Sequence, residues 1–181
     1  MATTGPDDFR QRARRAYEWG RLRHSLVNAW PALPLTALSC WLCHETGLSV
    51  AIGATLFALT TGLLWHGRIA TRAARAGLKA GMVAFAVPVA AFHSYFAPHC
   101  CTLTDMLIVN AGCGLGVGIL LSVESTHLQA QRNVFLLFAS VVAALCGMLG
   151  CILFGPMGLA GMAAGVVLST APIAIYRRAM A

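Results

Sequence analysis

The chain has 181 residues, of which 58% are hydrophobic and only 10% are charged, and its mean hydropathy is +0.72. A typical soluble domain carries about 25% charged residues, so this composition excludes an ordinary water-soluble globule. The formal net charge of +7 would suit a nucleic-acid-binding protein. The basic residues flank apolar segments, however, without a reading element or interleaved aromatic residues, so we expect no direct nucleic-acid partner.

A basic segment, residues 1–24, opens the chain and carries two aromatic residues, Tyr17 and Trp19, close to the first apolar run. We expect it to be a cytoplasmic helix that either lies on the membrane surface or docks a cytoplasmic partner. The candidate residues for contact with lipid or with a partner are Arg10, Arg12, Arg14, Arg15, Arg21 and Arg23.

Six apolar windows follow, and each approaches the roughly 20 residues that a helix needs to cross the hydrocarbon core of a membrane. The first begins after a long polar start and is followed by others, so we expect a span and not a removable signal peptide. Pro31 and Pro34 lie in its first turns, where a missing amide costs least, and Pro88 lies in mid-span in the third. The windows are residues 25–43, 48–66, 78–97, 104–123, 134–154 and 156–176.

These windows predict an all-α integral membrane bundle of six transmembrane helices over residues 25–176, followed by a tail of residues 177–181. Asn110 is the only strongly polar residue deep in a span and predicts a hydrogen bond between helices. Closely spaced small residues let membrane helices approach one another. We expect this of the glycines in the fourth and sixth windows, which are Gly112, Gly114, Gly116, Gly118, Gly158, Gly161 and Gly165.

The distribution of basic residues predicts the orientation. All thirteen Lys and Arg lie in the N-terminal segment, in residues 66–79, in residues 124–133 or in the C-terminal tail. The other three loops, residues 44–48, 98–105 and 154–156, contain none. Under the positive-inside rule both termini are cytoplasmic, which we place in a bacterial inner membrane.

Soft metal ligands gather on the opposite, periplasmic side. No cysteine lies in a predicted cytoplasmic segment. Cys113 and Cys146 lie deeper in their spans, where we expect them to pack as small apolar residues. The candidate metal or redox residues are Cys40, Cys43, His44, His93, His99, Cys100, Cys101 and Cys151.

Thiolate and imidazole ligands suit a soft or borderline metal ion of the zinc, copper or mercury class. The C-x-x-C spacing of Cys40 and Cys43 could grip one ion, with further ligands from the 98–105 loop. The same thiols could instead form disulfides, because the periplasmic face is oxidising, or they could be incidental. With His44 the sequence also matches the attachment motif of c-type haem, but we do not expect haem at the end of a membrane helix.

Catalytic patterns are missing from the sequence. There is no Ser–His–Asp arrangement, no phosphate-binding loop and no pair of acids, and no Asp, Glu or Lys lies in mid-span. We therefore expect neither an enzyme nor a proton-coupled pump.

The layout resembles that of the NrsF-type integral-membrane anti-sigma factors. The likeness lies in the cytoplasmic N-terminal segment, the six short spans, Cys100 or Cys101 just before the fourth span, and Cys151 at the end of the fifth. The chain differs by its C-x-x-C-H sequence ending at His44 and by lacking a His directly before Cys151. The resemblance implies a regulator that holds an extracytoplasmic-function sigma factor at the cytoplasmic face and releases it on a metal or redox signal.

An alternative function comes from the vicinal pair Cys100–Cys101, which is similar to the cysteine pairs of small mercury-uptake membrane proteins. That likeness implies a small heavy-metal-binding or heavy-metal-transport protein. A relay would need cysteines leading to the cytoplasmic face, which the sequence lacks, so sensing is favoured over transport. A structural subunit with incidental cysteines and a homo-oligomer both stay open.

Overall fold

A computed structural model of the chain describes residues 6–42, 46–91, 93–94, 103–127, 131–152, 158 and 160–168. Within these ranges the structure consists of helices joined by short turns and contains no strand, which confirms the all-α prediction. A 3-10 turn, η2 (Ser125–His127), follows α5, and residues 160–168 are also helical. The labelled helices are α1 (Pro6–Ala29), α2 (Ala32–Leu42), α3 (Thr46–His66), α4 (Arg68–Ala91), α5 (Leu103–Glu124) and α6 (Arg132–Cys151).

Four of these helices, α3 to α6, are long and apolar enough to cross a membrane, which indicates a multi-pass membrane protein. The 21 residues of α3 give a length of about 31 Å, close to the roughly 30 Å of a hydrocarbon core. Each predicted window from the second to the fifth therefore corresponds to a helix. The bounds of the third differ, because α4 already begins at Arg68, so most of the loop expected over residues 66–79 is helical.

The first predicted window is divided into two helices. α1 runs on to Ala29, Trp30 and Pro31 form a turn, and α2 has only 11 residues. This differs from the single helix expected over residues 25–43. Pro31 is the physical reason, because its ring removes an amide hydrogen and disfavours the helical conformation of Trp30. Of the sixth window, only residues 158 and 160–168 belong to the described part.

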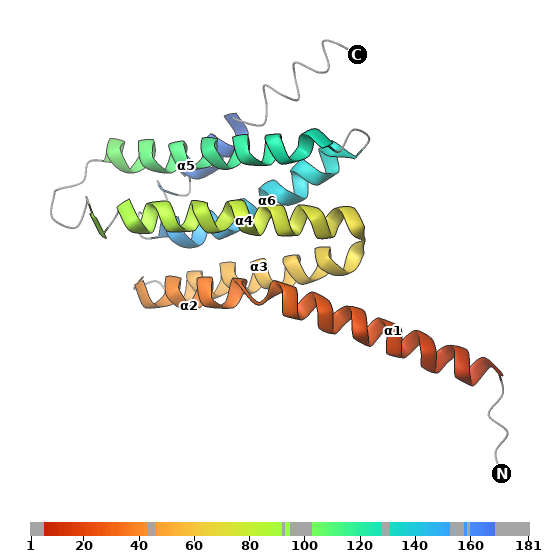
Figure 1. The fold of residues 1–181 in the computed structure, drawn as a ribbon. Helices are drawn as coiled ribbons and strands as arrows, with labels where there is room; N and C mark the ends of the chain where they lie inside the picture. The colour runs from red at the N-terminus through yellow and green to blue at the C-terminus, as the bar shows by residue number, and fades with distance from the viewer. Residues whose placement is uncertain are drawn as a thin grey trace.

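The helices pack in three layers, shown in Figure 1. α4 and α6 form the middle layer, with α2 and α3 on one side and α5 with the 160–168 segment on the other. Glycines bring the central pair together: a Cβ at Gly77 would lie 2.6 Å from the Ala139 carbonyl oxygen, and a Cβ at Gly150 would lie 2.8 Å from that of Phe85. Two buried hydrophobic clusters, one on each side, complete the core.

Close packing between α5 and the 160–168 segment also depends on glycine. A Cβ at Gly114 would lie 2.5 Å from the Met162 carbonyl oxygen and 2.9 Å from the Gly165 Cα. The close approach expected at these two glycines is therefore confirmed. Gly112 and Gly116 behave differently, because a Cβ at either would meet no described atom within 4 Å.

The two ends of the bundle carry different chemistry. One end holds the α3–α4 turn, η2 and the start of α6, and α1 extends beyond it (Figure 1). Gly67 makes the α3–α4 turn with φ of 146°, a conformation that favours glycine. The ends of α2, α4 and α6 and the start of α5 lie at the opposite end. The basic residues of α4 thus lie in the half of the helix nearer one end, with Lys79 at mid-helix, and Cys40 and Cys151 lie near the other end.

Candidate functional site

Three of the eight candidate metal or redox residues fall in the described part of the chain: Cys40, His93 and Cys151. Cys40 is half-buried near the end of α2, His93 is exposed just after α4, and Cys151 is fully buried at the end of α6. Among the described residues, no group of three or more His, Cys, Asp or Glu is placed to hold a metal ion. The other five candidates, Cys43, His44, His99, Cys100 and Cys101, lie outside the described residues.

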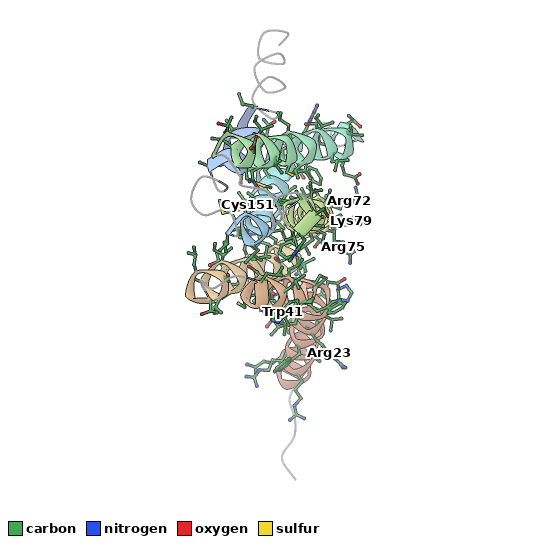
Figure 2. All side chains as sticks on the ribbon, turned by 90° about the vertical axis from the view of Figure 1, so that its left-hand side faces the viewer. Arg23, Trp41, Arg72, Arg75, Lys79 and Cys151 are labelled. Atoms are coloured by element: carbon green, nitrogen blue, oxygen red, sulfur yellow. The ribbon has the colours of Figure 1, made fainter. Side chains whose placement is uncertain are left out.

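Cys151 has a polar partner on α5. Its thiol donates a hydrogen bond to Asn110 Oδ1 across 2.7 Å, and both side chains are fully buried. Figure 2 shows Cys151 in the interior of the bundle. The hydrogen bond between helices predicted for Asn110 is therefore confirmed, and a candidate redox residue is its donor.

Cys113 lies next to this pair. It is three residues after Asn110 on α5, a spacing that puts both side chains on one face of the helix. Because Cys151 bonds to Asn110, the half-buried Cys113 lies on the face of α5 that Cys151 meets. The sequence analysis assigned Cys113 to packing and missed this neighbour. The spacing from Asn110 was the available signal, since a polar residue deep in a span marks an interhelical face.

Cys146 fits the packing role predicted for it. It is fully buried between α6 and α4, and a Cβ at Gly81 would lie 2.8 Å from its Sγ. The four described cysteines, which are Cys40, Cys113, Cys146 and Cys151, are all free thiols.

Cys40 and Cys151 face different surroundings although both lie at the same end of the bundle. The neighbour of Cys40, Ser39, donates a hydrogen bond to the Leu149 carbonyl oxygen of α6 over 2.9 Å. The Leu149 side chain packs in the cluster between α6 and the α2–α3 layer, whereas Cys151 packs in the cluster shared with α5. Two residues along a helix turn the side chain by about 200°. Cys151 therefore points away from the layer that carries Cys40.

The basic helix α1 forms the second part of the candidate site. Its residues 10–20 are all exposed, and Arg14 pairs with Glu18 one turn later at 3.1 Å. Near its end, Ser25 and Ala29 are buried, and α1 packs there against α3. The helix is therefore anchored by its last turns and projects away from the bundle (Figure 1). The projecting part carries the arginines predicted to contact lipid or a partner.

The described part of the molecule is thus all-helical, with four helices long and apolar enough to cross a membrane. A comparison with known protein families, curated proteins and solved structures found no match.

Proposed function

We propose that this protein is a bacterial inner-membrane regulator that responds to a soft metal ion or to thiol oxidation in the periplasm. Its output is a change in what the cytoplasmic helix α1 binds, as in anti-sigma factors of the NrsF type. One observation carries the proposal: free thiols lie at one end of the bundle, and an exposed basic helix projects from the other.

The proposed topology has six spans with both termini in the cytoplasm. α3 to α6 supply four of them. The 11 residues of α2 are about 17 Å long, so the first span also needs the last turns of α1. Residues 156–176 supply the sixth. The basic end of the bundle then faces the cytoplasm, as the positive-inside rule requires.

The proposed signal acts on the thiols at the periplasmic end. Cys40 is a free, half-buried thiol on α2, and Cys43 and His44 follow it within four residues. A soft metal would bind these groups with ligands from residues 98–105, and an oxidant would join two of the thiols. Either event forms bonds in one conformation of the protein that the other conformation cannot form. Such a difference is what allows a ligand to shift a conformational equilibrium.

The proposed route to the cytoplasm is α2 itself. Ser39, next to Cys40, attaches α2 to α6 through the Leu149 carbonyl, and α2 is joined to α1 by the turn at Trp30 and Pro31. A reaction at Cys40 that displaced Ser39 would release α2 from α6 and reorient α1. Coupling between distant sites needs an element with two states. In this proposal the element is α2, which is either docked against α6 or released from it.

The proposed output is electrostatic. Six arginines and one glutamate lie between residues 10 and 24, so α1 presents a strongly positive surface. An acidic surface on a cytoplasmic partner such as a sigma factor complements it. Anionic lipid competes for the same arginines, so reorientation of α1 would shift it between membrane and partner.

Thiol labelling in intact cells tests the sensing step. A membrane-impermeant maleimide is applied with and without Zn²⁺ or the oxidant diamide, and labelled cysteines are identified by mass spectrometry. We expect Cys40, Cys43, Cys100 and Cys101 to label in untreated cells and to be protected by metal or oxidant. The buried Cys146 is the internal control and should stay unlabelled until denaturation. Full labelling of all four residues under every condition would exclude sensing.

Heavy-metal binding or transport is the second candidate, and one observation favours it: Cys113 lies on the face of α5 to which Cys151 bonds through Asn110. This pair places thiols deeper in the bundle than the loop cysteines, as a relay would require. Uptake of Hg²⁺ into vesicles distinguishes the two functions. If the chain transports mercury, Cys100→Ser and Cys113→Ser should each slow uptake. Uptake no faster than in empty vesicles would exclude transport.

A further inference from the structure

A groove between α4 and α5 combines a basic end with an apolar end. The basic end is a cavity of about 580 Å³, lined by Arg72, Arg75 and Lys79 of α4 and by Glu124 of α5. The apolar end is a cavity of about 410 Å³, whose lining includes Val87, Ile108, Gly112 and Gly116. Val83 and Leu120 line both cavities, so the two adjoin.

The basic end is suited to an anion. Arg72, Arg75 and Lys79 are exposed, and their spacing of three and four residues puts them on one face of α4. Figure 2 shows all three on the same side of this helix. Glu124 contributes one negative charge to the same lining, so the net charge of the lining is +2. Arginine and lysine side chains donate hydrogen bonds that phosphate oxygens accept.

The apolar end is suited to a hydrocarbon chain. Gly112 and Gly116 have no side chains to fill it, and a Cβ at either position would meet no described atom within 4 Å. Val83 and Val87 of α4 flank these glycines and are 49% and 44% exposed. A slender apolar ligand can therefore lie along α5 without displacing any side chain of the described fold.

We propose that this groove binds one anionic phospholipid of the cytoplasmic leaflet. The phosphate lies between Arg72 and Lys79, and one acyl chain runs past Val83 along Gly116 and Gly112. In the proposed topology, Arg72 lies near the cytoplasmic end of α4, and Lys79 lies about 10 Å deeper, with a long side chain that extends towards the headgroup level where anionic lipid is attracted. The apolar end faces the hydrocarbon core. An acidic protein segment would satisfy the cations but would leave the apolar half of the groove empty. This site does not depend on any sensing by the thiols.

Native mass spectrometry of the purified full-length chain in detergent tests the site, with phosphatidylglycerol and phosphatidylcholine as probes. We expect the wild-type chain to retain phosphatidylglycerol in preference to phosphatidylcholine. Each cation near the membrane surface contributes roughly fivefold to affinity, so the double variant R72Q/K79Q should bind phosphatidylglycerol about 25-fold more weakly. Its affinity for phosphatidylcholine should not change. Both side chains are exposed, so the variant should keep its helix content by circular dichroism.

A matched control removes the same charge elsewhere. Arg68 is also exposed but lines neither cavity, so Arg68→Gln should leave the preference for phosphatidylglycerol unchanged, whereas Arg72→Gln alone should weaken the binding about fivefold. If this control lowers the affinity as much as Arg72→Gln does, the attraction is diffuse and the proposed site is wrong. Equal binding of the two lipids by the wild-type chain would also overturn it.

Two further arms test the acyl-chain half of the site. Gly116→Leu fills the apolar cavity and should weaken the binding of both lipids. Glycerol phosphate, inorganic phosphate and a soluble polyglutamate peptide lack acyl chains and should compete only weakly with phosphatidylglycerol. If Gly116→Leu has no effect, or if one of these soluble anions binds as tightly as the lipid, the groove is not a phospholipid site.

Discussion

The buried Cys151 thiol donates its hydrogen bond to Asn110 Oδ1, and this joins the last residue of α6 to α5. In an apolar bundle neither group has water as an alternative partner, so the bond fixes how the two helices are rotated relative to one another. It also turns the face of α5 that carries Cys113 towards Cys151, because Cys113 follows Asn110 by three residues.

Cys151 variants measure the strength of this link. Hydrogen bonds between membrane helices contribute about 0.6 kcal/mol on average and up to about 1.7 kcal/mol. We expect Cys151→Ala to lower the free energy of unfolding in mixed micelles by an amount in this range. Cys151→Ser keeps a donor and should lose less. If alanine is tolerated as well as serine, the hydrogen bond makes no contribution to stability.

Gly114 and Gly112 form a matched pair on α5. A Cβ at Gly114 would enter the backbone of the 160–168 segment, at 2.5 Å from the Met162 carbonyl oxygen. Overpacking of this kind costs about 1–3 kcal/mol, so Gly114→Ala should destabilise the fold by that amount. Gly112→Ala, with no described atom within 4 Å, should be neutral or slightly stabilising. Equal losses in the same unfolding assay would contradict the observed packing of α5.

Ser39→Ala tests the attachment of α2 to α6. The variant loses the hydrogen bond to the Leu149 carbonyl of α6 and the one shared with Ser49 Oγ of α3, each worth about 1 kcal/mol. We expect Cys40 to react faster with maleimide, because α2 separates more often from α6. The control is Thr55→Ala, since the exposed Thr55 hydroxyl bonds only to the Ala51 carbonyl of its own helix at 2.8 Å in the described structure. An unchanged rate in Ser39→Ala would show that Ser39 does not hold α2.

Much of the fold follows from the sequence. Hydropathy predicts the window 48–66, and α3 occupies Thr46–His66. The division at Pro31 was not predicted, because a hydropathy window averages over a single turn and gives no weight to one missing amide. The short length of α2 is a consequence of that break.

The neighbours of individual side chains were harder to predict. α5 is apolar apart from Asn110 and its first and last turns. Asn110 marks an interhelical face, but the sequence does not show that α6 is the helix that this face meets. The placement of Cys113 on the face of α5 that meets Cys151 depends on that rotation and became visible only in the structure. The common face of Arg72 and Lys79 was available from their seven-residue spacing. The sequence did not show that α5 lies opposite them or that two glycines of α5 line the groove.

Trp41 and Trp65 report the topology. Trp41 is 82% exposed near the end of α2, and Trp65 is 46% exposed at the far end of α3. In single-tryptophan variants in right-side-out vesicles, we expect external iodide to quench Trp41 fluorescence and to leave Trp65 unaffected. Inverted vesicles should give the opposite result. Quenching of both residues from the same side would contradict the crossing of the membrane by α3.

Coupling between the periplasmic thiols and α1 is tested most directly by the trypsin sensitivity of α1. Inverted vesicles are loaded with Zn²⁺ or diamide, trypsin is added outside, and cleavage after Arg10, Arg14 and Arg15 is followed by mass spectrometry. The proposed coupling predicts that metal or oxidant changes the cleavage rate several-fold in the wild-type chain and in Cys146→Ala, and has no effect in Cys40→Ser. Identical rates with and without metal or oxidant in the wild-type chain would contradict it.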